Sequence, residues 1–127
     1  FYLPEDVFEH LAASPAWEIG TLAFREAPDT PIACWAAHAH DRVYAPLVAG
    51  LDYRYVDRDK TYKQLLFQIL RRARALDAGL VRLGMTADQE KERWGSSKRD
   101  VAVFVQSGAG YNASLLRQIV AEEGLAA

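Results

Sequence analysis

The sequence predicts an α/β fold with a mixed, mainly antiparallel central sheet that is flanked by helices. Three apolar segments follow one another between Trp17 and Tyr53, as in antiparallel strands joined by short turns. After Thr61 the apolar residues change to helical spacing and then alternate with short strand-like runs, as in β-α-β units. With 127 residues, of which 50% are hydrophobic, we expect one globular domain over residues 1–127.

The N-terminal half is expected to begin with a short helix over Leu3–Ser14, because Pro4 suits the first turn of a helix. Strands are predicted at Trp17–Phe24, Ile32–His40 and Val43–Tyr53. The segment EAPDTP is predicted to be a turn because it holds two prolines and an aspartate. Pro46 cannot donate a sheet hydrogen bond, which predicts a sheet edge or a bulge at this position.

The C-terminal half is expected to begin with a long helix over Thr61–Leu76, whose apolar residues share one face. The later elements are predicted at Leu80–Gly84 (strand), Thr86–Trp94 (helix), Asp100–Ser107 (strand) and Asn112–Glu123 (helix). Thr86 is predicted to cap its helix, because Gln89 three residues later completes the pattern of a capping box.

Charge is distributed unevenly, although the net charge is only −2. Phe1–Ala33 holds six acidic residues and one basic residue, whereas Arg54–Arg74 holds seven basic and two acidic residues. A basic field of this kind suits a phosphate-bearing ligand, and the alternative is a solvated helix face. No apolar run is long enough to span a membrane, and no signal peptide is visible, so we expect a cytoplasmic protein.

A phosphate site is predicted where the third strand leads into YRYVDRDKTY and then the long helix. Ligands of α/β sheets bind at the carboxyl ends of strands, beside the N-terminus of a helix. Free amides at the start of this helix could hold a pyrophosphate, assisted by Arg54, Arg58 and Lys60. The alternative is a charged loop in which Asp59 caps the helix.

Several side chains are candidates for catalysis. His38 and His40 share one face of a strand, where they could hold a metal or supply a general base, or simply face solvent. Asp52 and Tyr53 end the third strand, where a catalytic group would reach the cleft, although both could equally be residues of a turn. Cys34 is interpreted as a core residue, and no metal site is predicted because no third ligand is apparent.

One stretch, VRLGMTADQEKERWGS, combines a strand that ends at Gly84 with a polar segment followed by Lys91, Trp94 and Gly95. Together with the helix YKQLLFQILRRARALDAG, it resembles the GNAT acyltransferase superfamily, in particular the branch related to FemAB-type aminoacyl transferases. The resemblance covers about residues 1–106. The chain is also similar to GNAT modules joined behind a pyridoxal-phosphate enzyme of the oxoamine synthase type. Because it begins without methionine, we expect a fragment of a longer chain.

The resemblance implies an acyl-CoA-dependent N-acyltransferase that moves an acyl group, such as acetyl, from a CoA thioester to a small-molecule amine. The residues implied to bind the CoA are Ala49, Gly50, Leu51, Arg58, Asp59, Lys60, Thr61 and Tyr62. The implied candidates for a general base are His38, His40 and Asp52. The residues implied to bind the substrate are Gly84, Lys91 and Trp94, with Lys91 directed at a phosphate or a carboxylate. The expected partners are the amine and the remainder of the chain, with no metal, membrane or nucleic acid.

Two alternatives remain open at this point. The segment Arg58–Gln64 contains no glycine and the short helix no tyrosine, which favours a non-catalytic accessory or docking domain of a larger enzyme. A third interpretation is aminoacyl transfer from tRNA, in which the basic helix would contact phosphates and binding would fall steeply with salt.

Overall fold

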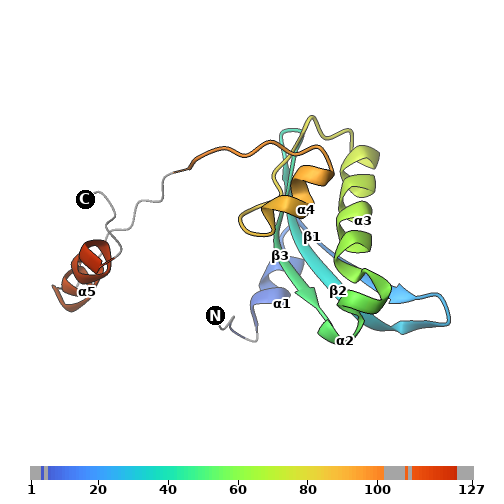
Figure 1. Ribbon diagram of the computed structural model, residues 1–127, viewed down its shortest axis with the longest axis horizontal. Coiled ribbons are helices and arrows are strands. Elements are labelled where there is room, and N and C mark those ends of the chain that lie inside the picture. The colour runs from blue at the N-terminus through green and yellow to red at the C-terminus, as the bar shows by residue number, and fades with distance from the viewer. Residues whose placement is uncertain (1–3, 5, 102–107, 109, 123–127) are drawn as a thin grey trace. The chain divides into compact units, whose positions relative to one another are not determined.

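The computed structural model describes residues 4, 6–101, 108 and 110–122. They belong to two compact units, Phe1–Ser96 and Ser97–Ala127, and each unit is considered by itself. The first unit contains α1 (Val7–Ala12), β1 (Trp17–Phe24), β2 (Ala27–His40), β3 (Val43–Leu51), α2 (Tyr53–Asp59), α3 (Thr61–Ala75), β4 (Leu80–Val81) and α4 (Asp88–Arg93) (Figure 1). The second unit contains α5 (Gly110–Glu122).

The four strands form one mixed sheet in the order β1-β2-β3-β4. β1, β2 and β3 pair antiparallel, and β4 pairs parallel to β3. The chain returns from β3 to β4 through α2 and α3, which is the crossover that a parallel pair requires. α3 covers one face of the sheet and contacts β2 and β3 (Figure 1). The predicted α/β fold with a mainly antiparallel mixed sheet is confirmed.

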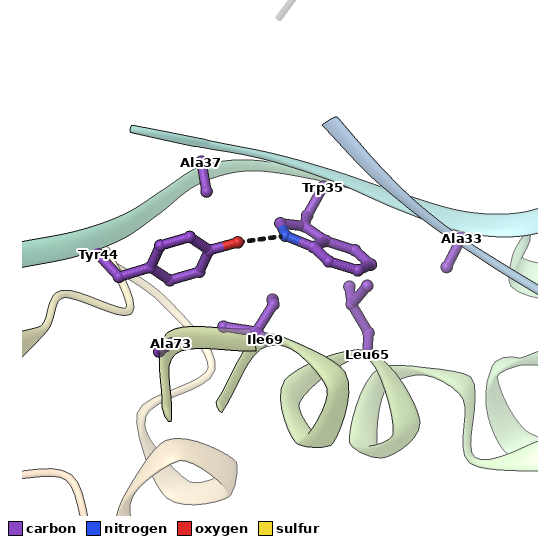
Figure 2. Close-up of a cluster of buried hydrophobic side chains, with 7 residues drawn as sticks. All are labelled: Ala33, Trp35, Ala37, Tyr44, Leu65, Ile69 and Ala73. Carbon is purple, nitrogen blue, oxygen red and sulfur yellow. Dashed lines mark hydrogen bonds between the residues drawn. The ribbon is translucent and has the colours of Figure 1, made fainter. Parts of the chain in front are cut away.

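The hydrophobic core lies between β2 and α3. Side chains alternate across a strand, so Ala33, Trp35 and Ala37 share the face of β2 that α3 covers. They pack against Leu65, Ile69 and Ala73, which recur at helical spacing on α3 (Figure 2). The indole of Trp35 lies over Gly20, where an added Cβ would come within 2.1 Å of the ring. A side chain on β1 at this point would therefore displace the largest residue of the core.

A polar network runs through this core. The Trp35 Nε1–H group donates a 2.9 Å hydrogen bond to the hydroxyl of Tyr44, which is 1% exposed (Figure 2). That hydroxyl donates in turn to Glu18, and Arg72 holds the Glu18 carboxylate through Nε and Nη2. Burial and the hydrogen bond to Glu18 raise the pKa of Tyr44 far above its ordinary value. Tyr44 is therefore a neutral donor at physiological pH, and the network joins β1, β2, β3 and α3.

Several predicted elements need correction. Most of the predicted turn EAPDTP, Ala27–Pro31, belongs to β2, whereas Glu26 remains in the turn. Residues 27–31 are exposed and show no apolar pattern, and Ala27 and Pro31 pair with Phe24 and Ala23 of β1. The segment after Asp52 is a helix, α2, and not a loop. β4 ends at Val81, before the predicted end at Gly84. The predicted strand Asp100–Ser107 falls mostly outside the described residues, and Asp100 and Val101 belong to no helix or strand.

The predicted capping box of α4 is also wrong. The N-cap is Ala87, with φ 52°, which makes no side-chain capping hydrogen bond. Thr86 has φ 66°, a left-handed conformation that disfavours β-branched residues. The contacts of Lys91 with this segment, described below, favour a backbone path in which the Thr86 hydroxyl does not cap the helix.

Candidate functional site

β3 and β4 separate after a very short region of pairing. They pair only at Val43–Leu80 and Tyr44–Val81, followed by a 2.9 Å hydrogen bond from Arg82 N–H to the Tyr44 carbonyl. β3 then continues to Leu51 while β4 has already ended. Within the described part of the chain, the outer edge of β3 beyond Tyr44 therefore has no neighbouring strand, and its backbone groups are free to bind a ligand.

The hydrogen bonding of β3 shows which groups lie on this free edge. Asp52 N–H donates to the Ile32 carbonyl of β2 at 2.8 Å. Because backbone groups alternate between the two sides of a strand, Gly50 also faces β2, whereas Ala49 and Leu51 present N–H and C=O outward. Of the three residues of β3 that the resemblance implies for CoA binding, Ala49 and Leu51 present backbone groups on the free edge, and Gly50 is engaged in the sheet.

A β-bulge precedes these residues. The pairing with β2 shifts from Ala37–Pro46 to Ala36–Val48, which leaves Leu47 as the extra residue. The predicted edge or bulge at Pro46 is confirmed. A bulge increases the local twist and bends the strand, which accounts for the divergence of β3 from β4 at this point.

The loop after β4 forms the other side of the opening. At Gly84, with φ 70°, an added Cβ would lie 3.9 Å from the Pro46 carbonyl oxygen, so the loop runs close to the start of the free edge. Lys91 is only 6% exposed, and its ammonium donates to the carbonyls of Gly84 (3.1 Å) and Met85 (2.8 Å). Burial lowers the pKa of Lys91, an effect that nearby Asp88 opposes. The side chain of Lys91 thus stabilises this loop by binding two of the loop's backbone carbonyls.

α4 packs beside α3 through two contacts. The ring of Trp94, at the end of α4, lies 6.3 Å from the ring of Phe67 on α3, centroid to centroid. Lys63 and Glu90 form an ion pair of 3.7 Å between the same helices. Trp94, predicted to bind substrate, is 39% exposed and therefore has an accessible surface as well as a structural contact.

The start of α3 is less open than the sequence suggested. Only Lys60, in a left-handed conformation with φ 53°, separates it from the C-terminus of α2. The Thr61 hydroxyl donates to the Tyr55 carbonyl at 2.9 Å, and Arg58 is paired with Asp59 at 2.8 Å. The C-terminal carbonyls of α2 and the Asp59 carboxylate place negative charge beside the N-terminus of α3. This charge offsets the positive end of the helix dipole and weakens its attraction for an anion. Asp59 does not cap α3, whose N-cap is Lys60.

Some binding capacity nevertheless remains at this helix start. The first amides of α3 have no acceptor within the helix, and the exposed Lys60 forms no ion pair with any described residue. Tyr62 is half-buried, and burial together with Glu90 raises its pKa. A pocket of about 190 Å³ is lined by Leu22, Ala23, Phe24, Arg25, Ile32, Asp59, Thr61 and Gln64. It is smaller than typical ligand pockets, so the strand edge is the better candidate site.

The three candidate bases do not form one cluster. His38 and His40 lie on the face of β2 opposite α3, where His38 packs edge-on against Trp17 at 5.5 Å. His38 is opposite Ala45, near the start of β3, whereas Asp52 follows the end of β3. Asp52 caps α2, and the hydrogen bonds from Arg54 hold the pKa of its carboxyl below its usual range. The structure therefore brings only Asp52 to the end of the free edge.

The comparisons with known proteins agree with this arrangement of strands. The family model of the acetyltransferase (GNAT) domain matches residues 2–92. The chain belongs to this GNAT family. The match includes the whole sheet, α3 and most of α4, and it confirms the superfamily that the segment from Gly84 to Gly95 resembles. GNAT domains use acetyl-CoA or another acyl-CoA as co-substrate. No curated protein and no solved structure matches the chain.

Two further observations concern this GNAT domain. In the part of the chain that the structure describes, no helix is both long and apolar enough to cross a membrane. Within the same residues, no group of three or more histidine, cysteine, aspartate or glutamate side chains is arranged to hold a metal ion.

Sequence reasoning missed the Glu18–Tyr44 pair, which fixes the strand on which the candidate site lies. One signal was present, because Glu18 is the only charged residue in the otherwise largely apolar segment Trp17–Phe24. A carboxylate in such a strand needs a partner when it is partly buried. Its two partners, Tyr44 and Arg72, lie 26 and 54 positions away, so no local pattern could name them.

Proposed function

We propose that this domain transfers an acyl group from a coenzyme A thioester to the amine of a small molecule. The observation that carries the proposal is the free edge of β3 beyond Tyr44, together with the family match. The amide groups of a pantetheine arm would pair with Ala49 and Leu51 as a short additional strand, which is how extended ligands bind to free sheet edges.

The chemistry needs few side chains. The amine, once it has lost its proton, attacks the thioester carbonyl; the carbon–nitrogen bond forms, the carbon–sulfur bond breaks, and CoA leaves as the thiol after gaining a proton. A backbone N–H on the strand edge would stabilise the oxyanion of the tetrahedral intermediate. Asp52, beside Leu51, is the candidate base nearest this edge, although its lowered pKa makes it a weak one.

The phosphates of CoA would lie at the start of α3. The free amide of the half-buried Tyr62 and the ammonium of the exposed Lys60 supply donors there, whereas Thr61 is only 1% exposed. Arg58 is held by Asp59, so it would contribute only after that pair rearranges. We further propose that the acceptor is a small-molecule amine and that the domain is one cytoplasmic module of a longer enzyme. Within the superfamily, we propose a relationship to the FemAB-type branch.

A proline substitution on the strand edge tests the proposal. Ala49→Pro removes an outward N–H without breaking a bond to β2. Losing one such bond costs about 0.5–1.5 kcal/mol, so the Kd for acetyl-CoA in calorimetry should rise roughly 2- to 12-fold. The matched control is Thr21→Pro on β1, at the opposite edge of the sheet, which should leave the Kd unchanged. Equal affinities for the native chain and both variants would contradict the proposal, as would a complete lack of binding in the native chain.

A charge reversal tests the phosphate end separately. Lys60→Glu places a negative charge at the first turn of α3 and should weaken acetyl-CoA binding, with a larger effect at low salt. S-acetylpantetheine, which lacks the phosphates, should bind the native chain and this variant equally. An unchanged affinity of the variant for acetyl-CoA would show that the phosphates bind elsewhere.

One observation supports an alternative function. α2 occupies the segment that leads into α3, and this segment contains no glycine. The C-terminal carbonyls of α2 and the carboxylate of Asp59 would repel a phosphate at that position. A domain that kept the fold but served as an accessory or docking module would have these properties. Cooperative unfolding with no stabilisation by any CoA would favour this function over catalysis.

A further inference from the structure

Lys91 has an unusual pair of partners for a buried cation. The residue is 6% exposed, and its ammonium donates to two consecutive backbone carbonyls, those of Gly84 and Met85, at 3.1 and 2.8 Å. Both carbonyl oxygens therefore accept from the same nitrogen atom. The orientation of two successive peptide groups in the loop is fixed by this contact.

The geometry of the peptide group then determines where the corresponding N–H groups point. No cis peptide bond occurs among the described residues, and in a trans peptide the N–H is directed opposite to the C=O. The carbonyls of Gly84 and Met85 share peptide groups with the amides of Met85 and Thr86. These two N–H groups are therefore directed away from Lys91, and neither donates to a backbone carbonyl in the described part of the chain.

The charge of Lys91 strengthens these two donors. A cation bound to the carbonyl end of a peptide group polarises it and makes its N–H a better donor. Gly84 and Thr86 are both left-handed, with φ 70° and 66°, and such a conformation persists in a threonine only where the surroundings impose it. The bonds from Lys91 to the carbonyls of Gly84 and Met85 fix the two peptide groups that precede Thr86.

The two amides are also accessible and well placed. Met85 is 76% exposed, so solvent reaches the side of the loop away from Lys91. Gly84 lies beside Pro46, at the start of the free edge of β3. We infer that the amides of Met85 and Thr86 bind an anionic group with two oxygens, a carboxylate or a phosphate, and that Lys91 is the positioning residue that orients them.

This inference deepens the proposed function, on which it rests for the identity of the substrate in the cleft. Two neighbouring donors on one side of a loop suit the two oxygens of one carboxylate or phosphate. The anion would belong either to the acceptor, as the carboxylate of an amino acid, or to the donor, as a phosphate of CoA. Lys91 would act on it from behind the loop without touching it.

Backbone amide spectra of the isotope-labelled chain test the inference with sodium acetate and inorganic phosphate as probes. The N–H signals of Met85 and Thr86 should shift in a saturable manner with at least one probe. Lys91→Met removes the ammonium and keeps most of the side-chain volume, and it should weaken the fitted affinity at least tenfold. Lys63→Met, which removes the same charge from the neighbouring α3, is the matched control and should leave the affinity unchanged.

The outcomes separate this inference from the proposed function. Absence of saturable shifts at both amides in the native chain overturns it, even if acetyl-CoA still shifts Ala49 and Leu51. Equal affinities in the native chain and Lys91→Met overturn the role of Lys91, and Lys91→Gln replaces Lys91→Met if circular dichroism shows that Lys91→Met is unfolded. Shifts with phosphate but not with acetate would assign the site to the donor, whereas shifts with acetate but not with phosphate would assign it to the acceptor.

Discussion

Arg72 on α3 and Glu18 on β1 are joined by a 2.8 Å hydrogen bond between Nη2 and Oε2, although 54 positions separate them in the chain. The same carboxylate accepts the hydroxyl of Tyr44, the last residue at which β3 pairs with β4. The point at which the two strands separate is thus tied to the opposite edge of the sheet and to α3. The free edge of β3, where we place the acyl donor, begins at a rigidly anchored residue.

Removing the hydroxyl of Tyr44 should destabilise the domain. In Tyr44→Phe the buried N–H of Trp35 loses its acceptor, which costs about 1–3 kcal/mol. Thermal unfolding should show a fall in Tm of about 4 °C or more for a unit of this size. Tyr111→Phe removes a hydroxyl from a side chain that is 80% exposed and should leave Tm nearly unchanged. Equal Tm values for Tyr44→Phe and the native chain would show that the network contributes nothing.

Stability should depend on pH through Glu18. Burial by itself raises the pKa of this carboxyl, but hydrogen bonds from Arg72 and Tyr44 outweigh it and hold the pKa below its ordinary value of 4.5. The charged form is therefore favoured by folding, and its contribution is present above pH 4.5 and lost as the pH falls through the lowered pKa. Urea unfolding should show that the native chain exceeds Glu18→Gln in stability at pH 7 by more than it does at pH 3. A difference that does not change with pH would contradict this assignment.

A methyl group at Gly20 should also disturb the core. The added Cβ of Gly20→Ala would lie 2.1 Å from Trp35 Cζ2, so the indole or the strand must move, at a cost of about 1–3 kcal/mol. The midpoint of denaturant unfolding should fall accordingly. Gly79→Ala is the matched control, because the nearest side-chain atom there is 3.8 Å away and φ is not left-handed. The explanation fails if both substitutions have the same small effect.

The left-handed conformation of Thr86 gives a prediction of the opposite sign. A β-branched residue at φ 66° is strained by roughly 1–2 kcal/mol, whereas asparagine tolerates this region. Thr86→Asn should therefore leave the free energy of unfolding unchanged or raise it by up to about 1 kcal/mol, and the Tm should stay the same or rise. A fall in Tm for Thr86→Asn would contradict the strained conformation.

Long amphipathic segments were predictable because their pattern has a direct physical cause. The stripe of Leu65 and Ile69 on α3 exists because one face of the helix is buried, and the alternation around Trp35 exists because one face of β2 is buried. Pro46 marked a bulge because proline lacks the donor that a regular ladder needs. The exposed part of β2 before Pro31 and the polar helix α2 bury little apolar surface, so no pattern predicted them.

By itself, then, the sequence determined the fold class, the position of the core helix and the family to which the segment from Gly84 to Gly95 points. Only the tertiary structure decided which groups of the site are free. It engaged Gly50 with β2, paired Arg58 with Asp59 and turned Lys91 inward to the loop carbonyls. The physical reason is that hydrogen bonds and ion pairs depend on distances between groups that are remote in the chain. Hydrophobic periodicity, by contrast, is a local property that each segment carries on its own.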